Sequence, residues 1–399
     1  MSDRTTPDQR RPKITRREML RQSSFLTVGL AATPVPGWPR SWFLPEEVVV
    51  PFTDIPENFT GRRPMNPEPH PGASLIAQDR RNLTESTTPI EDFFVVSHYD
   101  YPVVDPAAYR LRLDGLVGRP ISLSLAELRA RPAVERTTTF ECGGNARGLL
   151  HGMVGNATWR GVELEPLLEE AAPGPNALEV HFWGADGGAE EIRGAEYEQN
   201  FARSMTMAQI AERRPILAYE MNGQPLPIVH GFPVRLVVPG WYGVAQVKWL
   251  QRLWVSPERL MTRFMARDYV TLQGFEENGG IRWVETSVTK QRPKSVIARV
   301  TRDGDLFKIF GAAWTDGTPL RGVDVQVDGG AWQPATLEQS ANPFSWTFFT
   351  LQTRGLADGE HRLASRATDT EGRTQPENLD LKRTRWENNE LFHRTIRVS

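Results

Sequence analysis

Residues 219–250 read YEMNGQPLPIVHGFPVRLVVPGWYGVAQVKWL, and this stretch holds the densest turn and strand signals of the chain. Met221-Asn-Gly223 predicts a turn, His230-Gly231 opens a loop, and a strand is expected to begin at Arg235. Gly240 to Gly243 then leads toward Lys248. His230, Arg235 and Lys248 can converge on a phosphate-bearing ligand, since Arg offers a planar fork and Lys a point charge. Taken singly, each side chain is also compatible with a surface or packing role.

Around this stretch, from Phe93 to Ser256, short strand-like runs alternate with a few helical segments. Ser124-Leu-Ala-Glu127 is typical of a capping box that opens a helix ending before Pro132. Pro166 to Ala172 predicts another short helix, with Pro at its first position and Pro173-Gly174 to stop it. The alternation predicts a mixed α+β domain. The strand-like runs are Tyr109 to Leu113, Thr137 to Glu141, Leu178 to Trp183, Ile216 to Tyr219, Val234 to Val238 and Val247 to Val255.

After about Arg292 the pattern changes to short alternating runs such as Val323-Asp-Val-Gln-Val327 and Arg362 to Ala367. Asp-Gly pairs at 303, 316, 328 and 358 are strong turn signals between them. Strands and turns in this rhythm, without a helical segment, predict a β-sandwich of about 100 residues. Because this region contains no obvious catalytic cluster, we expect its role to be structural or interfacial.

Length and composition agree with two domains and exclude several kinds of site. The 399 residues include 47 basic and 49 acidic ones, so the net charge of −2 provides no basic field for a nucleic acid or an anionic membrane. Cys142 is the only cysteine. It excludes an intrachain disulfide, a site with several cysteine ligands and the C-x-x-C-H attachment of a c-type haem.

The N-terminal region resembles an export signal. Residues 13–37 hold a basic stretch, a short apolar run from Phe25 to Ala32, and then small residues and prolines. The run is far shorter than the ~20 residues that cross a bilayer, so we expect no membrane span. The pair Arg16-Arg17 ahead of it resembles a twin-arginine signal. We therefore expect residues 1–37 to direct a folded, cofactor-loaded protein to the periplasm, and the Pro-rich residues 38–90 to form an extended arm.

Cys142 is the strongest candidate for chemistry. It follows the strand-like Thr137 to Glu141 and precedes Gly143-Gly-Asn-Ala-Arg147. Two glycines let the backbone approach a ligand, and Arg147 can lower the pKa of the thiol, so a thiolate that binds a metal is expected here. Two alternatives stay open at this point: a small buried side chain, and a Cys–His hydrolase. The histidines that could serve as its base are His98, His151 and His230.

Several motifs together resemble the sulfite oxidase family of molybdenum enzymes. They are Cys142-Gly-Gly-Asn-x-Arg147, Tyr219-Glu-Met-Asn-Gly-Gln-Pro-Leu-Pro227, His230 to Gly240 and Val247-Lys-Trp-Leu250, and, further on, Gly322 to Gly330, Arg366-Ala-Thr-Asp369, Gln375-Pro376 and Asn388 to Val398. The resemblance implies a molybdenum–molybdopterin cofactor with one Cys ligand. It also implies a catalytic domain over residues 91–290 and an immunoglobulin-like dimerisation domain over 291–399, hence a homodimer.

The resemblance implies a role for each residue of this sequence that matches a functional position of the family. Cys142 matches the thiolate ligand of molybdenum, Arg147 the basic residue that faces the substrate oxyanion, and Tyr269 the active-site tyrosine. The positions that match contacts to the pterin and its phosphate are His98, Asp186, Ser204, His230, Arg235 and Lys248.

The chain also departs from the family pattern. Val96 stands where the family usually has an Arg, two positions before His98. The loop between Arg147 and Trp159 is shorter than in animal and plant members and brings no Trp before Gly155. The segment from Ser340 to Trp346 lacks an Arg that some members carry. A pocket with fewer arginines should bind doubly charged sulfite more weakly. The residues that could compensate are Arg160, Arg203 and Arg267.

The resemblance implies oxidation of sulfite to sulfate by oxo transfer. Arg147 would hold the oxyanion, and Tyr269 would hydrogen-bond the transferred oxygen. Without a haem motif in the sequence, the electrons would pass to a separate c-type cytochrome. One alternative keeps the cofactor and makes the protein a reductase of S-oxides or another oxyanion. The other is an exported, non-catalytic binding or scaffold protein, against which Cys142, Arg147 and Tyr269 together argue.

Overall fold

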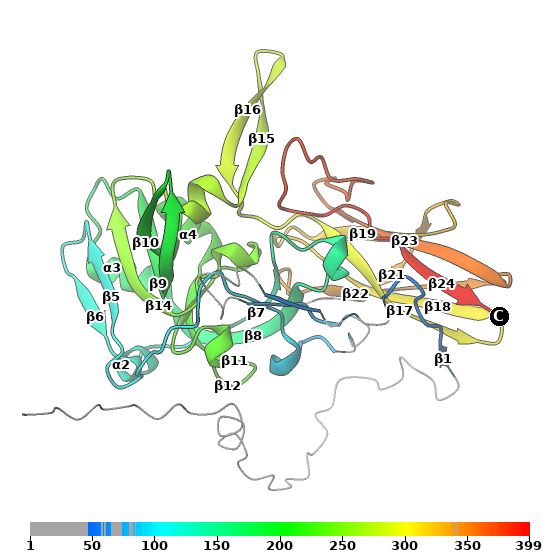
Figure 1. Cartoon of the computed structure of the whole chain (residues 1–399), viewed down its shortest axis with the longest axis horizontal. Coiled ribbons are helices and arrows are strands. Elements are labelled where there is room, and N and C mark those ends of the chain that lie inside the picture. The colour runs from blue at the N-terminus through cyan, green and yellow to red at the C-terminus, as the bar shows by residue number, and fades with distance from the viewer. Residues whose placement is uncertain are drawn as a thin grey trace, which may run out of the picture. The chain divides into compact units, whose positions relative to one another are not determined.

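The computed structural model describes residues 47–56, 59, 61–64, 74–79, 83, 85–338, 340 and 342–399. The predicted signal of residues 1–37, with Arg16 and Arg17, lies outside these residues. The described chain forms two domains built mainly from β-sheets (Figure 1). The predicted class, an α+β domain followed by a β-sandwich, is confirmed.

The first domain is built on two sheets. The first sheet has the order β10-β9-β14-β5-β6, in which β14 runs parallel to β5 and the other pairs are antiparallel. In the second sheet β12, β11, β8 and β7 are consecutive neighbours, and β13 also pairs with β11. The bounds are β5 Leu111–Gly115, β6 Ile121–Leu123, β7 Val134–Glu141, β8 Val154–Glu163, β9 Glu179–Ile192, β10 Ala195–Thr206, β11 Ile216–Met221, β12 Gln224–Pro225, β13 Arg235–Val237 and β14 Leu250–Ser256.

Short helices connect these strands. Helix α2, Leu125–Arg129, begins with the predicted capping box, in which Ser124 and Glu127 satisfy each other's backbone N–H groups. Helix α3, Leu164–Ala171, begins two residues earlier than expected, and Pro166 still lies in the first turn, where no backbone N–H has a helical partner. Helix α4, Met207–Arg213, has a second capping box at Thr206 and Gln209.

The second domain is a sandwich of two sheets, with orders β1-β17-β18-β22-β21 and β20-β19-β23-β24. Apolar side chains of both sheets share one core, among them Ile309 and Phe349 of the first and Val325 and Leu363 of the second. The bounds are β1 Val48–Val49, β17 Lys294–Asp303, β18 Leu306–Trp314, β19 Leu320–Val327, β20 Gln333–Pro334, β21 Thr336–Leu337, β22 Thr347–Arg354, β23 Gly359–Asp369 and β24 Arg394–Val398.

The described part of the predicted arm carries more regular structure than expected. Strand β1 adds to the edge of β17, and β2 Arg62–Pro64 and β3 Ser74–Ile76 form a small sheet with β4 Val95–Val96. Between the domains, β15 Val270–Glu277 and β16 Gly280–Ser287 form a separate hairpin.

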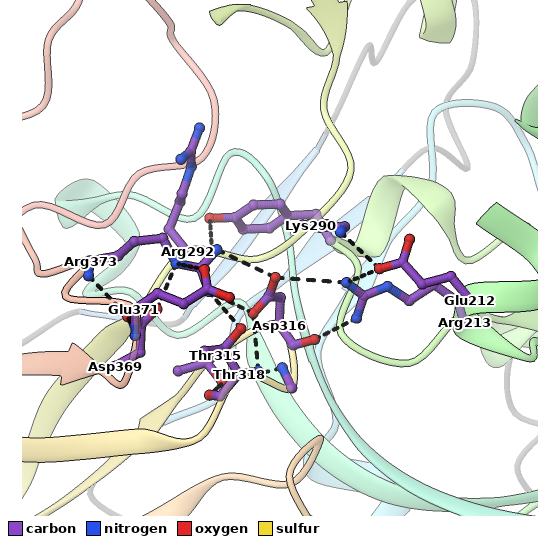
Figure 2. Close-up of polar contacts among 12 residues, drawn as sticks. Glu212, Arg213, Lys290, Arg292, Thr315, Asp316, Thr318, Asp369, Glu371 and Arg373 are labelled. Carbon is purple, nitrogen blue, oxygen red and sulfur yellow. Dashed lines mark hydrogen bonds and ion pairs between the residues drawn. The ribbon is translucent and has the colours of Figure 1, made fainter. Parts of the chain in front are cut away.

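A polar cluster around Asp316 joins the two domains (Figure 2). Arg213, at the end of α4, donates to the Asp316 carbonyl at 2.6 Å, and Arg373 of the sandwich donates to Asp316 Oδ1 at 2.9 Å. Arg373 also donates to Asp369 at 2.6 Å. Asp316 therefore links an arginine from each domain.

Candidate active site

One cavity collects most of the predicted site residues. Its volume, measured with a water-sized sphere, is about 60 Å³. Its lining comes from β4 and the residues after it, the end of β7, β9, β13 and the loops around Val229 and Val244. The predicted site residues that line it are His98, Cys142, Asp186, His230, Arg235, Lys248 and Tyr269.

Cys142 lies at the wall of this cavity, directly after β7. Its backbone N–H donates to Met153 O at 3.0 Å, which continues the pairing of β7 with β8. Burial raises the pKa of the Cys142 thiol to about 11, although the Gly144 N–H opposes the shift. Arg147 is not among the groups that act on this pKa in the structure. A bound cation would stabilise the thiolate and so favour loss of the proton.

The two glycines after Cys142 make room for aromatic rings. A Cβ on Gly143 would lie 3.5 Å from the Tyr269 ring, and one on Gly144 would lie 3.2 Å from the Trp386 ring. The rings of Tyr269 and Trp386 stack with centroids 4.0 Å apart. Trp386 comes from the sandwich domain, so the second domain contributes a side chain beside the cavity. No sequence pattern indicates this residue, because more than 240 positions separate it from Cys142.

Tyr269 follows a π-helical turn, Arg263–Arg267, and has a positive φ of 57°. A π-helical turn and a positive φ at a non-glycine residue are both uncommon, and both are over-represented at functional sites. The Tyr269 hydroxyl lies 2.9 Å from His98 Nε2. Burial raises the pKa of Tyr269 well above its usual value, and burial with the charges of Arg263 and Lys248 lowers the pKa of His98 to about 3. At neutral pH the pair is therefore a protonated phenol and a neutral imidazole.

Lys248 and Arg235 contribute positive charge to the lining of the cavity. Lys248 Nζ donates to Ser97 Oγ and Val229 O, both at 3.0 Å, and lies over the Trp249 ring. Arg235 donates to His230 O at 2.9 Å. Burial, followed by the charge of Arg235, lowers the pKa of Lys248, while burial alone lowers the pKa of Arg235 to about 9.

Two buried polar atoms at this cavity have no hydrogen-bond partner in the described part of the chain: Asp186 Oδ1 and Arg235 Nε. Buried polar groups are nearly always satisfied, and a lost partner costs about 1–3 kcal/mol. Burial raises the pKa of Asp186, and the charge of Lys248 opposes the shift. The cavity is therefore suited to a polar ligand that supplies donors to Asp186 and acceptors to Arg235.

Ser204 and Arg147 do not line this cavity. Ser204 Oγ donates to Glu179 Oε2 at 2.6 Å. The two residues are diagonal neighbours on the same face of the paired strands β10 and β9. Arg147 begins a 3₁₀ turn whose buried member is Leu149, so its side chain is exposed. It borders a separate surface pocket together with Arg362 and His393.

The arginines expected to compensate for Val96 also lie outside the cavity. Arg160 makes surface ion pairs with Glu135 and Glu220, and Arg267 pairs with Glu190. Arg203 is buried and donates to the carbonyls of Phe264 and Val288, which precede and follow Tyr269 in the sequence. Val96 itself lines the cavity, where Arg235 is the single arginine among the described lining residues.

Each of the two domains matches a known protein family. Residues 98–264 match the oxidoreductase molybdopterin binding domain, and residues 266–398 match the Mo-co oxidoreductase dimerisation domain. Sulfite oxidase of Gallus gallus is 33% identical over 370 residues, which cover 82% of this chain and 76% of that protein. This chain belongs to the sulfite oxidase family of molybdenum enzymes.

Two further proteins are similar over most of the chain. Mitochondrial sulfite oxidase of Homo sapiens is 33% identical over 82% of this chain. The chain spans 64% of that protein's length. The solved sulfane dehydrogenase SoxCD of Paracoccus pantotrophus superposes with a TM-score of 0.71 at 26% identity, covering 92% of this chain and 100% of that one.

The cofactor of this domain family is molybdenum bound to molybdopterin, and the residues of the cavity fit it. Cys142 offers one buried thiol, which is a soft ligand. Arg235 and Lys248 can meet a phosphate, and Asp186 Oδ1 and Arg235 Nε await polar partners. No group of three or more His, Cys, Asp or Glu side chains that could bind a metal ion occurs among the described residues.

Proposed function

We propose that this protein oxidises sulfite to sulfate. The observation that carries the proposal is a single cavity lined by one buried thiol, by the hydrogen-bonded pair of Tyr269 and His98, and by the basic side chains of Arg235 and Lys248. The comparison with sulfite oxidases over four-fifths of the chain supports it. The molybdenum–molybdopterin group, when bound, supplies two-electron oxygen-atom transfer, in which sulfite gains an oxygen derived from water and two electrons and two protons are released.

The side chains of the site have distinct proposed tasks. Cys142 would hold molybdenum through Sγ, while Arg235, Lys248 and Asp186 would bind the pterin and its phosphate. The Tyr269 hydroxyl keeps its proton and can donate it in a hydrogen bond to the oxygen being transferred when neutral His98 carries its proton on Nε2 and donates to the phenol oxygen.

Substrate access involves the surface side of the Cys142 loop. Arg147 stands five residues after Cys142 and is exposed to solvent. We assign it the attraction of the oxyanion, which requires its side chain to turn away from the pocket of Arg362 and His393. Ser204, which reaches Glu179 rather than the cavity, would act on the pterin only through β10.

The test is turnover by the molybdenum-loaded protein. Sulfite should reduce ferricyanide in the presence of the enzyme, and activity should scale with molybdenum content. Cys142→Ser should fold but contain little molybdenum, which separates loss of the cofactor from loss of the fold. A fully loaded protein that leaves sulfite unchanged would contradict the proposal.

We further propose a periplasmic enzyme whose electrons pass to a separate c-type cytochrome. The twin-arginine pattern at Arg16-Arg17 and the lack of a haem attachment motif in a sequence with one cysteine support this. No described helix combines the length and the apolar character needed to span a bilayer. Residues 1–46 fused to a reporter should carry it to the periplasm, and replacing Arg16 and Arg17 by Lys should retain it in the cytoplasm.

A second candidate is reduction of an S-oxide or another oxyanion. The observation in its favour is that Arg235 is the single arginine among the described lining residues, with Val96 at the position of the family Arg. If Arg235 and Lys248 bind the pterin and its phosphate, little positive charge is left for the substrate, which disfavours a dianion relative to a neutral substrate. Reduced viologen as electron donor with a panel of S-oxides would test it, and reduction faster than sulfite oxidation would favour this reaction.

A further inference from the structure

Glu190, near the end of β9, accepts hydrogen bonds from two segments of the candidate active site. Tyr99, which directly follows His98 in the sequence, donates its hydroxyl proton to Glu190 Oε1. Arg263, the first residue of the π-helical turn, donates from Nη1 to the same oxygen at 2.9 Å. The Glu190 side chain is only 8% exposed, so water and salt screen its ion pair with Arg263 weakly. Glu190 therefore joins the segment of His98 to the π-helical turn.

Arg263 also holds Asp268, the residue directly before Tyr269. The Arg263 Nε donates to Asp268 Oδ2 at 2.6 Å, and the Arg263 carbonyl accepts the Asp268 N–H at 2.7 Å. Tyr269 follows with its φ of 57°, a left-handed conformation that is strained for a residue other than glycine. Such strain persists only where the surrounding contacts over-determine the backbone. The two bonds between Arg263 and Asp268 provide contacts of this kind.

These contacts complete a ring around the hydrogen bond between Tyr269 and His98. One end of the chain of contacts is joined by a peptide bond to His98 and the other to Tyr269, and the two side chains meet at 2.9 Å. The ring holds together the segment after β4, the end of β9 and the π-helical turn. Because a hydrogen bond weakens steeply when its geometry changes, the position of Glu190 affects the bond between Tyr269 and His98.

The same contacts place a permanent positive charge beside His98. Burial alone would lower the pKa of Arg263, but hydrogen bonds to Glu190 and Asp268 outweigh it and raise that pKa. After burial, the charge of Arg263 is the largest cause that lowers the pKa of His98. Arg263 is therefore held as a cation where it favours the neutral imidazole.

We propose that Glu190 and Arg263 are positioning residues that hold Tyr269 and His98 in register for oxygen transfer. The inference rests on the proposed oxidation of sulfite. Neither Glu190 nor Arg263 is among the described residues that line the cavity, so each acts through the segment it holds. A donor that is already aligned before the reaction needs no reorganisation in the transition state. Loss of the ring should therefore lower kcat and leave KM nearly unchanged.

The kinetic test compares Glu190→Ala with Glu191→Ala in the molybdenum-loaded protein. Glu191 is the matched control, because it is the next residue of β9, is exposed and points to the opposite face of the strand. Glu190→Ala should lower kcat for sulfite about ten- to a hundredfold at the molybdenum content of the wild type, since a misplacement of about 1 Å costs about a hundredfold. Glu191→Ala should match the wild type. Glu190→Gln keeps a carbonyl oxygen for both donors and should recover most of the loss.

Magnetic resonance of protein labelled with isotopic histidine provides a readout that needs no turnover. The chain has seven histidines, and Tyr269→Phe identifies the Nε2 resonance of His98 by shifting it. Glu190→Ala should shift the same resonance, and Glu191→Ala should not. If Glu190→Ala does not fold, Tyr99→Phe removes only one hydroxyl of the ring and should give the same shift in a folded protein.

An unchanged His98 resonance in the folded ring variants would overturn the proposal, whatever happens to kcat, because the loss would then not act through the pair. Wild-type kcat in Glu190→Ala would also overturn it. A wild-type protein that leaves sulfite unchanged would contradict the proposed reaction, and the resonance would still decide whether the ring positions His98.

Discussion

The buried ion pair between Glu141 and Lys294 connects the loop of the proposed molybdenum ligand to the sandwich domain. Both side chains are fully buried, and Lys294 Nζ donates to Glu141 Oε1 and to Asn388 O, each at 2.5 Å. Trp314 Nε1 donates to Glu141 Oε2 at 2.9 Å, and Asn145 Nδ2 to Oε1 at 3.0 Å. The carboxylate directly precedes Cys142 in the sequence, so its position determines where the thiol lies.

Lys294→Met should destabilise the protein strongly. The substitution leaves a buried carboxylate with two neutral donors and no cation, and breaking such a pair costs about 3–5 kcal/mol. For about 350 folded residues the entropy of unfolding is about 0.7 kcal/mol/K, so we expect the melting temperature to fall by about 4–7 °C. Molybdenum content should fall as well, because the Cys142 loop loses its anchor.

The assay is differential scanning calorimetry together with molybdenum analysis of wild type, Lys294→Met and the double variant Glu141→Gln/Lys294→Met. The double variant should regain most of the loss, because replacing both buried charges is often close to neutral. Lys308→Met is the control, because it removes a lysine of the same domain whose ion pair with Glu47 is longer, at 3.6 Å. A fall of less than about 1 °C in Lys294→Met would refute the reasoning, since it would mean that the pair contributes little to stability.

Three further predictions follow from the site and from the domain contact. Cys142→Ser should abolish sulfite turnover while leaving the melting temperature of the cofactor-free protein within a few degrees of the wild type, and full turnover by this variant would contradict the assignment. Val96→Arg should lower the Michaelis constant for sulfite roughly ten- to a hundredfold and make it more salt-dependent, since a charge-assisted hydrogen bond contributes ~1.5–3 kcal/mol; a weaker sulfite reaction would show that another group already fills this role. Burial alone would raise the pKa of Asp316, but hydrogen bonds from Arg373 and Thr318 outweigh it and hold the pKa below its usual value. Its carboxylate therefore stabilises the fold above pH ~4, and this contribution is lost as the pH falls through the lower folded-state pKa. Asp316→Asn should be less stable at pH 7 and should show a smaller loss of stability between pH 5 and pH 2 in urea titrations.

The local elements of the first domain could be predicted because their signals are local. The capping box at Ser124, the strand that ends at Glu141 and the strand around Arg235 are encoded by residues a few positions apart, and the structure contains them within two or three residues. The Asp-Gly turns and alternating runs likewise predicted the sandwich. The start of α3 was misplaced because Pro is tolerated throughout the first turn and not at its first position alone.

The composition of the cavity was also accessible to sequence reasoning. His98, Cys142, Asp186, His230, Arg235, Lys248 and Tyr269 come from separate segments, and seven of the nine predicted positions line one cavity. They could be named because the resemblance to the family matched each of these positions. Arg147 and Ser204 were named in the same way, yet a 3₁₀ turn and a strand face direct their side chains elsewhere.

The sequence by itself determined the order of the domains, the single thiol and the positions that carry charge, since these depend on residue identity and short-range pattern. Only the tertiary structure decided that Trp386 of the second domain stacks on Tyr269, that Lys294 meets Glu141 across 153 positions, and that the β15–β16 hairpin stands exposed. Such contacts depend on how two sheets and a connecting segment pack in space. Packing is a property of the whole chain, so no window of neighbouring residues contains it.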